Sequence, residues 1–339
     1  MDNIIPVGKL PSDLLARLLA GAPVHDKRVL LGPGIGLDCA VIDMGDRLLV
    51  WKSDPITFAT DEIGWYAVQV NSNDIATTGA LPRWMLVTLL LPEGKTTPAL
   101  VEEIFGQVFR ACENAGIALV GGHSEITYGL DRPILVATLT GEVQREQLVT
   151  PQGCRPGDRV LLTKGVPIEG TAVLARQFPE RLSGVLSQQE LSQAQQYLYS
   201  PGISVLKDAR IALQAGRVTS MHDPTEGGLA TALWELAEAA GVSIRFEPGA
   251  VPVPPLAERV CRAFGLDPLG TIASGALLLT VSPESASSVL RALENEGIAC
   301  AEIGGVEAGE PQVQVEKNGR VESLPRPVRD EIARLYEAS

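Results

Sequence analysis

Three aspartates in one glycine-rich stretch constrain this chain more than any other sequence feature. The stretch runs from residue 32 to residue 80, GPGIGLDCAVIDMGDRLLVWKSDPITFATDEIGWYAVQVNSNDIATTGA. Asp38 follows a loop of glycines and precedes a short apolar run, and Asp54 follows a second apolar run. Short apolar runs bounded by turn residues favour strands, so we expect both aspartates at strand ends.

The third aspartate, Asp74, falls in a predicted helix from about Glu62 to Thr78. Asn71, Asp74 and Thr78 are spaced to share one polar face of that helix. Carboxylates on separate elements beside a glycine-rich loop suit Mg²⁺ carried by a nucleotide, because Mg²⁺ takes oxygen ligands and shares carboxylates with phosphates. Ordinary turn formation explains the same residues when spacing alone is considered, since glycine and aspartate are common in turns.

Composition sets the classes of protein to which the chain can belong. With 339 residues, 45% hydrophobic and 20% charged, it can form two domains with sizeable cores. A net charge of -13 opposes binding to nucleic acids and anionic membranes, although ATP can bind where a metal ion supplies positive charge. The five cysteines are widely spaced and predict neither a disulfide framework nor a zinc site.

No segment of the sequence predicts export or insertion into a membrane. The N-terminal residues, MDNIIPVGKLPSDLL, lack a basic region followed by a long apolar core. The apolar run from Trp84 to Leu91 is far shorter than the roughly 18 residues of a membrane helix, and it predicts a buried strand. We therefore expect a cytoplasmic protein that binds neither membranes nor nucleic acids.

A second glycine motif, Gly121-Gly122-His123, follows a predicted short buried strand at residues 117–120. Paired glycines let a loop approach a ligand and direct N–H groups at an anion, and His123 could then bind a phosphate or orient a metal-bound water. An ordinary turn is the alternative. Lys9, near the start of the chain, is either a solvated lysine or part of an arm that reaches a phosphate.

A domain boundary is predicted at residues 150–158, TPQGCRPGD, which are rich in proline and glycine. It divides the chain into domains of residues 1–150 and 151–339. Strands and helices alternate in the second part, which predicts an α+β sandwich. The expected elements include a helix at 97–115, strands at 134–143, 159–163 and 271–281, and a helix at 229–240.

The segment before the last of these helices reads HDPTEGG, residues 222–228. Asp223 and Glu226 have the spacing of a capping box, with proline at the first helical position. Capping does not explain the paired glycines, Gly227 and Gly228, which destabilise a helix start but admit a ligand to it. Because a helix N-terminus attracts anions, a phosphate site is the competing interpretation.

Taken in order, these segments resemble the AIR-synthase superfamily. Its members include aminoimidazole ribonucleotide synthase, thiamine-monophosphate kinase, selenophosphate synthetase and the hydrogenase maturation factor HypE. The E-G-T-A and D-P-T-x-G-G-L-A segments are most similar to HypE-like, AIR-synthase-related proteins. The matching motifs are G-x-D-x-A (36–40), S-D-P (53–55), N-x-N-D-I-A-x-x-G-A (71–80), G-G-H-S (121–124), E-G-T-A (169–172), D-P-T-E-G-G-L-A (223–230) and A-S-G-A-L-L (273–278).

The resemblance implies a PurM-like fold with an N-terminal α/β domain, a C-terminal α+β domain, and a homodimer with ATP bound where the N-terminal sheets of two subunits meet. It also implies roles for individual residues. The candidates are Asp54, His123 and Lys9 for catalysis; Asn71, Thr57, Gly121, Gly122, Asp223, Gly227 and Gly228 for ATP; and Asp38, Asp54, Asp74 and Asp223 for Mg²⁺.

The resemblance predicts ATP-dependent phosphoryl transfer to an unidentified acceptor, or ATP-driven dehydration of one. HypE ends in Pro-Arg-Ile-Cys, whereas this chain ends in YEAS, so dehydration on its own tail is not expected. Cys39 stands where many relatives carry a second acid. A buried or turn thiol is favoured over a nucleophile because no base is visible beside it. The alternatives are a non-catalytic ATP-binding accessory protein in metalloenzyme maturation, working with a protein partner, and a small-molecule kinase similar to thiamine-monophosphate kinase.

Overall fold

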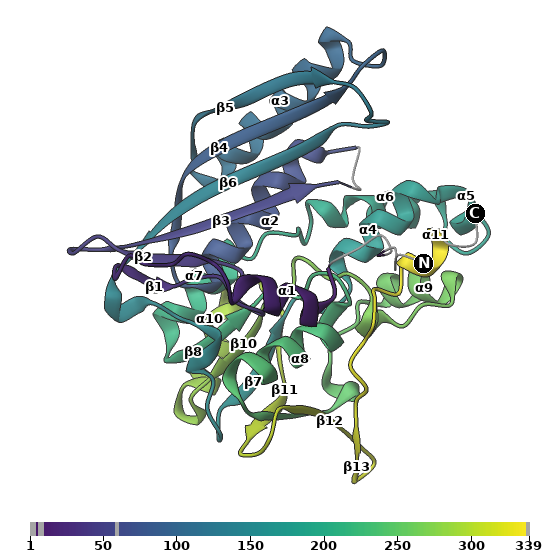
Figure 1. The fold of residues 1–339 in the computed structure, drawn as a ribbon. Coiled ribbons are helices and arrows are strands. Elements are labelled where there is room, and N and C mark those ends of the chain that lie inside the picture. The colour runs from purple at the N-terminus through teal and green to yellow at the C-terminus, as the bar shows by residue number, and fades with distance from the viewer. Residues whose placement is uncertain (1–4, 6–9, 58–60, 337–339) are drawn as a thin grey trace.

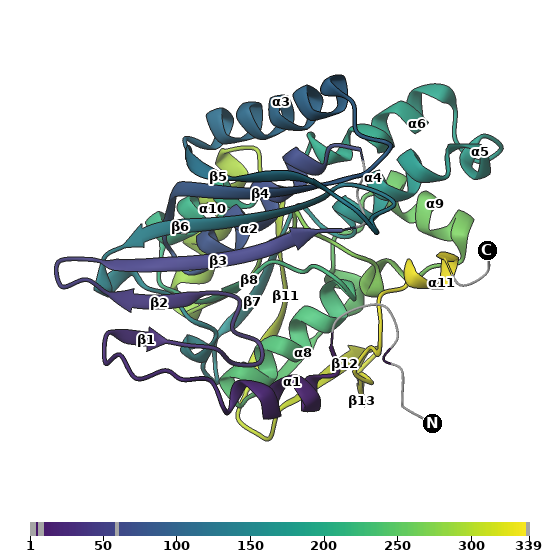
Figure 2. The same cartoon turned by 45° about the horizontal axis from the view of Figure 1, so that its top comes forward.

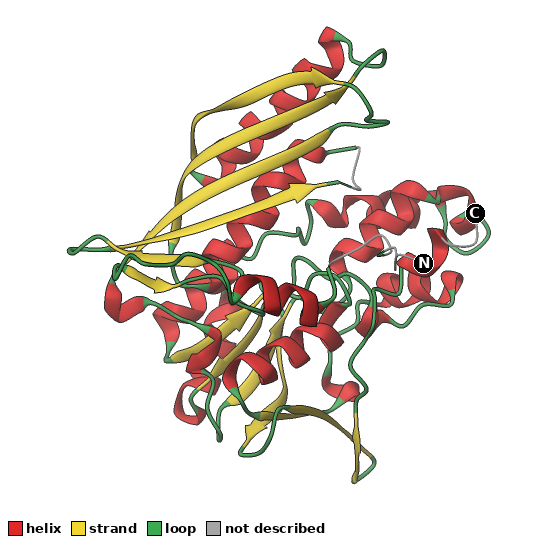
Figure 3. Cartoon of the chain, in the orientation of Figure 1, coloured by secondary structure: helices red, strands yellow, loops and turns green. Residues whose placement is uncertain are grey.

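The computed structural model describes residue 5 and residues 10–57 and 61–336. These residues form two sheets with helices packed on them (Figure 1, Figure 3). Helix α1 (Ser12–Leu19) precedes both sheets.

The first sheet has six strands in the spatial order β1-β2-β3-β6-β4-β5. Neighbouring strands are antiparallel except β4 and β5, which are parallel and are therefore joined through a helix. The strands are β1 (Val29–Leu31), β2 (Ala40–Asp43), β3 (Leu48–Ile56), β4 (Leu81–Pro92), β5 (Ala118–Thr127) and β6 (Ile134–Val143).

Helices α2 (Ile63–Thr77) and α3 (Pro98–Ala115) cover one face of this sheet, behind the strands in Figure 1 and with α3 above them in Figure 2. Side chains alternate between the two faces of β4, so Met85 is buried beneath the helices. On the opposite face, Trp84 is 40% exposed, Leu86 45% exposed and Trp51 of β3 42% exposed. The sheet therefore has one covered face and one open face that carries large apolar side chains.

The second sheet has seven strands in the order β13-β12-β9-β11-β7-β10-β8. It is mixed, because β9 and β12 are parallel and the other pairs antiparallel. The strands are β7 (Arg159–Thr163), β8 (Val218–His222), β9 (Ser243–Phe246), β10 (Leu278–Val281), β11 (Cys300–Glu307), β12 (Gln312–Lys317) and β13 (Arg320–Ser323).

Eight α-helices accompany this sheet within the described residues: α4 (Ile168–Gln177), α5 (Pro179–Leu182), α6 (Gln188–Gln195), α7 (Leu206–Ala215), α8 (Gly228–Ala240), α9 (Pro255–Phe264), α10 (Pro283–Asn295) and α11 (Ala333–Tyr336). Short 3-10 turns lie at Arg145–Gln147, Pro151–Gly153, Gln196–Leu198, Pro248–Ala250 and Pro268–Gly270.

The two sheets confirm the predicted fold class, α/β followed by α+β. Along the sequence, the strands of the first sheet come before residues 150–158 and those of the second sheet come after them. Helix α2, however, packs on both parts of the chain. Tyr66 joins the hydrophobic cluster around α4 and α9, and Ala76 joins the cluster around α7 and β8. The division into residues 1–150 and 151–339 remains a prediction, and α2 is the element that connects the two parts.

Three local predictions were wrong. Residues Gly121 to Ser124 lie inside strand β5 and do not form a loop. The reason is close pairing with β4, since a Cβ on Gly122 would lie 1.9 Å from the carbonyl oxygen of Val87. Asp54 lies within β3, which continues to Ile56, and not after its end.

The third error concerns residues 271–281, where a single strand was predicted. Only the part from Leu278 onward is strand β10. Gly275 has a φ of +108°, a conformation that favours glycine and interrupts an extended chain. An added Cβ there would also lie 2.8 Å from the carbonyl oxygen of Gly202, so the backbones approach closely at this point.

Candidate functional site

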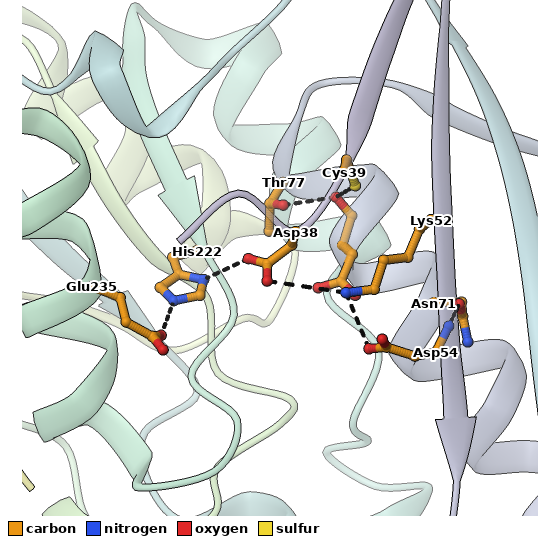
Figure 4. Close-up of polar contacts among 9 residues, drawn as sticks. Asp38, Cys39, Lys52, Asp54, Asn71, Thr77, His222 and Glu235 are labelled. Carbon is orange, nitrogen blue, oxygen red and sulfur yellow. Dashed lines mark hydrogen bonds and ion pairs between the residues drawn. The ribbon is translucent and has the colours of Figure 1, made fainter. Parts of the chain in front are cut away.

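Three of the predicted aspartates meet around a lysine that the sequence interpretation did not include (Figure 4). The Nζ atom of Lys52 lies 2.8 Å from Oδ2 of Asp74 and 3.0 Å from Oδ2 of Asp54. A third carboxylate, that of Asp38, is 4.0 Å away through Oδ1. The side chains of Lys52 and Asp74 are 9% and 6% exposed, so this is a largely buried ion cluster.

Strand and helix geometry bring these residues together. Lys52 and Asp54 are two positions apart on β3, and alternate residues of a strand point to the same face, here the face covered by α2. Asp74 projects from α2, and Asp38 lies just before β2. Within the first part of the chain, the cluster thus draws on a loop, a strand and a helix.

Asn71 holds β3 in place beside α2. Its Oδ1 accepts a hydrogen bond of 3.0 Å from the backbone N–H of Asp54, and its Nδ2 donates to the carbonyl oxygen of Ala67 at 2.8 Å. The side chain is fully buried, so both of its polar ends are satisfied by backbone. In this arrangement Asn71 positions Asp54.

Asp223 adds a fourth carboxylate from the second part of the chain. It is 1% exposed, and its Oδ2 has no hydrogen-bond partner among the described residues. Burial raises the pKa of Asp223 to about 6, with the neighbouring His222 opposing that rise. Burial also raises the pKa of Asp74 well above its ordinary value, the charge of Asp223 raises it further, and Lys52 opposes both. Only a positive charge can make this concentration of acids stable in the ionised form.

His222 links the cluster to helix α8. Its Nε2 lies 2.8 Å from Oε2 of Glu235, and its Nδ1 lies 3.8 Å from Oδ2 of Asp38 (Figure 4). Burial alone would lower the pKa of His222, but the hydrogen bond and charge of Glu235 raise it to about 9. Asp38, His222 and Glu235 line a cavity of about 20 Å³, room for a single water molecule.

Cys39 is a buried thiol, as predicted, and is 5% exposed. Its Sγ donates to the carbonyl oxygen of Asp74 at 3.3 Å. Burial raises the pKa of Cys39 well above its ordinary value, and Asp74 raises it further. A thiol held in its protonated form is a poor nucleophile.

The glycine motif of β5 does not belong to this cluster within one protomer. Gly121, Gly122 and His123 lie on the exposed edge strand, with β6 and β4 between them and the Asp54 strand. The side chain of His123 is 66% exposed and lies 3.2 Å from Oε2 of Glu125. Thr57 is half-buried and directly follows β3, and Lys9 lies outside the described residues.

At the start of α8, the capping interpretation was wrong. The N-cap residue is Gly227 with a φ of +77°, and Asp223 lies upstream of the helix and makes no cap hydrogen bond. The N–H of Gly227 donates to Oδ2 of Asp330 at 2.6 Å. A carboxylate from the C-terminal segment therefore occupies the anion position at this helix start. Gly228 is required by packing, since an added Cβ would lie 2.6 Å from the carbonyl oxygen of Leu269.

The residues around Lys52 match Mg²⁺ in donor chemistry, because all four carboxylates supply hard oxygen ligands. Their arrangement is that of an ammonium site, with Nζ of Lys52 lying between the carboxylates. Across residues 10–57 and 61–336, no group of three or more histidine, cysteine, aspartate or glutamate side chains is arranged to hold a metal ion. No helix in the same ranges is long and apolar enough to cross a membrane.

Sequence reasoning found the acids and missed Lys52, His222 and Glu235. The signal for Lys52 is its position two residues before Asp54, which places both side chains on one face of a strand. His222 directly precedes Asp223, so a residue assigned to the site has it as an immediate neighbour. Glu235 could not be assigned from its position, because many glutamates lie on exposed helix faces and only the packing of α8 directs this one at His222.

The fold and the site define a class of protein: an α/β part followed by an α+β part, with an acidic, cation-holding site built from both. Residues 36–143 match the N-terminal domain of the AIR synthase related proteins, and residues 155–316 match the C-terminal domain of the same family. The chain belongs to the AIR synthase related protein family, which confirms the resemblance inferred from its motifs.

Two curated relatives carry names from hydrogenase maturation. A putative hydrogenase expression/formation protein of Methanocaldococcus jannaschii is 29% identical over 270 residues, which cover 77% of each chain. The carbamoyl dehydratase HypE of Rhizobium leguminosarum is 29% identical over 259 residues, covering 75% of this chain and 71% of the relative.

Solved structures with the same fold include HypE and thiamine-monophosphate kinase. HypE in complex with ATP superposes with a TM-score of 0.68 at 24% identity, covering 92% of this chain and 89% of that one. A thiamine-monophosphate kinase complex, AaThiL with AMPPCP and TMP, gives a TM-score of 0.72 at 24% identity and covers 94% of both chains. At these identities the likeness establishes the fold alone.

Proposed function

We propose that this protein is an ATP-dependent enzyme that transfers a phosphoryl group to an acceptor, or uses ATP to dehydrate one. The observation that carries the proposal is the convergence of Asp38, Asp54 and Asp74 on one cation beside the buried Asp223. Catalysis of phosphoryl transfer consists mainly of positioning and charge neutralisation, so acids, a cation and backbone N–H groups are sufficient. The solved HypE and thiamine-monophosphate kinase complexes contain ATP and AMPPCP, which supports a nucleotide here.

In this proposal each residue has a defined task. The four aspartates, Asp38, Asp54, Asp74 and Asp223, provide oxygen ligands for Mg²⁺. Bound Mg²⁺ would supply positive charge to the phosphate oxygens. Asn71 keeps Asp54 in position through the backbone of β3. The remaining candidates for contact with the triphosphate in the same protomer are Thr57 and Lys9, whereas the N–H of Gly227 already donates to Asp330 and leaves the helix start at Gly227 and Gly228 without a free anion position.

We propose further that the nucleotide lies at the interface of a homodimer. In one protomer, Gly121, Gly122 and His123 are exposed on the sheet edge and take no part in the aspartate cluster. The edge strand of a second subunit would bring the same residues close to the site. The open sheet face, with its exposed Trp51 and Trp84, supports association through the first sheet. We place this homodimer in the cytoplasm.

Calorimetric titration with AMPPCP and Mg²⁺ tests the nucleotide site. We expect the wild type to bind and Asp54→Asn to show no detectable binding, because the substitution removes a charged ligand next to Lys52. Asp46→Asn is the matched control, since Asp46 is 75% exposed in the turn before β3 and should leave binding unchanged. Unchanged affinity in Asp54→Asn would reject the proposed metal assignment.

A non-catalytic accessory role is the second candidate, supported by the names of the relatives and by the solved HypE-HypF complex. A third, closer to thiamine-monophosphate kinase, is supported by the shared fold. Phosphate release from ATP, measured across a panel of small acceptors, separates these functions. Turnover with a small acceptor identifies an enzyme, and thiamine monophosphate in the panel tests the third candidate. Tight nucleotide binding without turnover supports the accessory role.

A further inference from the structure

The position of Lys52 has a chemical consequence beyond nucleotide binding. The geometry points to Lys52 as a built-in cation of the acidic cluster: its ammonium group takes the place of a free divalent ion, so a metal ion enters only together with nucleotide phosphates. This inference rests on the proposed function in one respect, that the cluster is the cation side of a nucleotide site.

The first support is the ratio of charges. Three carboxylates lie within 4.0 Å of the single ammonium of Lys52, and the lysine side chain is 9% exposed. The other well-buried lysine of the described ranges, Lys164, pairs with one carboxylate, that of Asp208 at 3.1 Å. Its Nζ also donates to two backbone carbonyls. Lys164 therefore has the surroundings of a structural ion pair. Around Lys52 the carboxylates outnumber the cations even when His222, which lies beside Asp38 and Glu235, is counted with Lys52.

The second support is an unused ligand atom. Oδ2 of Asp223 is buried without a hydrogen-bond partner, and Asp223 interacts electrostatically with Lys52 and Asp38. A buried carboxylate oxygen without a partner is unfavourable unless a cation or a proton reaches it. The cluster thus has an acceptor atom for a second positive charge, which Lys52 alone does not satisfy.

Repulsion between like charges explains why a metal ion, the second positive charge, would enter the cluster only together with the nucleotide. A free divalent ion among these carboxylates would lie within a few ångströms of the ammonium, where cations repel strongly in a buried setting. Phosphate oxygens remove this conflict, because they accept hydrogen bonds from lysine and coordinate the metal as well. The long, flexible lysine stem allows Nζ to move from carboxylate to phosphate without a change in the backbone.

Binding of Mn²⁺ to the nucleotide-free protein tests this inference, with the free-ion signal measured by electron paramagnetic resonance. The variants are Lys52→Met, which removes the charge, and Lys52→Arg, which keeps it. Lys207→Met is the matched control, because Lys207 forms an exposed ion pair of 3.0 Å with Glu296. Circular dichroism establishes that each variant is folded.

We expect Lys52→Met to bind one Mn²⁺ at least about tenfold more tightly than the wild type, since a charge that competes with the metal has been removed. The wild type, Lys52→Arg and Lys207→Met should show no saturable binding below millimolar concentrations. Saturable binding to the nucleotide-free wild type would overturn the inference, and so would equal affinities of the wild type and Lys52→Met.

Should Lys52→Met not fold, Lys52→Gln removes the same positive charge and keeps all four carboxylates. It should bind Mn²⁺ more tightly than the wild type, and equal binding would reject the role of Lys52. These measurements contain no nucleotide, so their outcome is separate from that of the AMPPCP titration. A wild type that fails to bind AMPPCP rejects the proposed function, whereas Mn²⁺ binding to the nucleotide-free wild type rejects only this inference.

Discussion

The side chain of Asn73 binds the backbone on both sides of Ser204 and so connects the two parts of the chain. Its Oδ1 accepts from the N–H of Val205 at 2.9 Å, and its Nδ2 donates to the carbonyl oxygen of Ile203 at 2.8 Å. Asn73 is fully buried on α2, one residue before Asp74. The element that supplies the buried aspartate of the site is thereby fixed to the second part of the chain.

Replacing Asn73 with alanine should destabilise the protein by about 2–4 kcal/mol, because a buried N–H and a buried carbonyl both lose their partner. Ser72→Ala is the control: Ser72 is its equally buried neighbour, but its Oγ has no hydrogen-bond partner in the described structure. We expect that change to cost less than about 1 kcal/mol. Urea denaturation measures both, and similar losses would show that the Asn73 hydrogen bonds contribute little.

Glu169 predicts a pH dependence of stability. This residue of α4 is 6% exposed, and burial raises the pKa of its carboxyl group from 4.5 to about 7. Between pH 4.5 and 7 the native state therefore holds a proton on Glu169 that the unfolded chain has released. The contribution of this protonated carboxyl group to the free energy of unfolding is full below pH 4.5 and is lost as the pH rises through 7.

Glu169→Gln should not show this loss of stability between pH 4.5 and 7, because glutamine does not titrate. Relative to the wild type, the variant should gain about 3 kcal/mol between pH 4.5 and 7, measured by denaturation at several pH values. Glu190→Gln should behave in the opposite way, because Arg259 lowers the pKa of Glu190 to about 2. Relative to the wild type, Glu190→Gln should be less stable above pH 4.5, the ordinary pKa of glutamate, and this difference should decrease as the pH falls toward 2. A pH-independent difference between Glu169→Gln and the wild type would contradict the assignment.

Sequence patterns were sufficient where one local signal determined the structure. Helix α2 was predicted at residues 62–78 and found at Ile63–Thr77, and strands β6 and β7 were found at the predicted residues. Apolar periodicity specifies such elements without knowledge of their neighbours. Asp38, Asp54 and Asp74 were likewise predicted to meet, because separate motifs placed them beside the same predicted phosphate site.

The errors arose where a neighbour decided the conformation. Gly121 and Gly122 carry the local signal of a loop, yet pairing with β4 makes them strand. The cap of α8 depends on Asp330, more than one hundred residues along the chain, and not on the adjacent Asp223. Lys52 was overlooked because a lysine in a strand usually faces solvent. Only the packing of β3 on α2 turns this one inward.

The open face of the first sheet predicts the effect of a new charge on association. Leu86, 45% exposed on that face, should lie in the interface of the proposed homodimer. Leu86→Glu should weaken dimerisation at least about tenfold, because the interface would have to bury an unpaired carboxylate. Phe109→Glu is the control on helix α3, where Phe109 is 54% exposed. Sedimentation velocity measures the species present, and a monomeric wild type at micromolar concentration would contradict the proposed interface.

The ion pair between His222 and Glu235 gives a direct spectroscopic prediction. Glu235→Gln should lower the pKa of His222 from about 9, because the hydrogen bond and charge of Glu235 oppose the effect of burial, while Asp38 and Asp223 still raise the pKa. The chain has only three histidines, so NMR titration of their ring protons can follow each one. In the wild type, His222 should remain protonated at pH 8 and contribute stability that is lost as the pH rises through 9. An unchanged His222 pKa in Glu235→Gln would show that Glu235 does not hold the charge on His222.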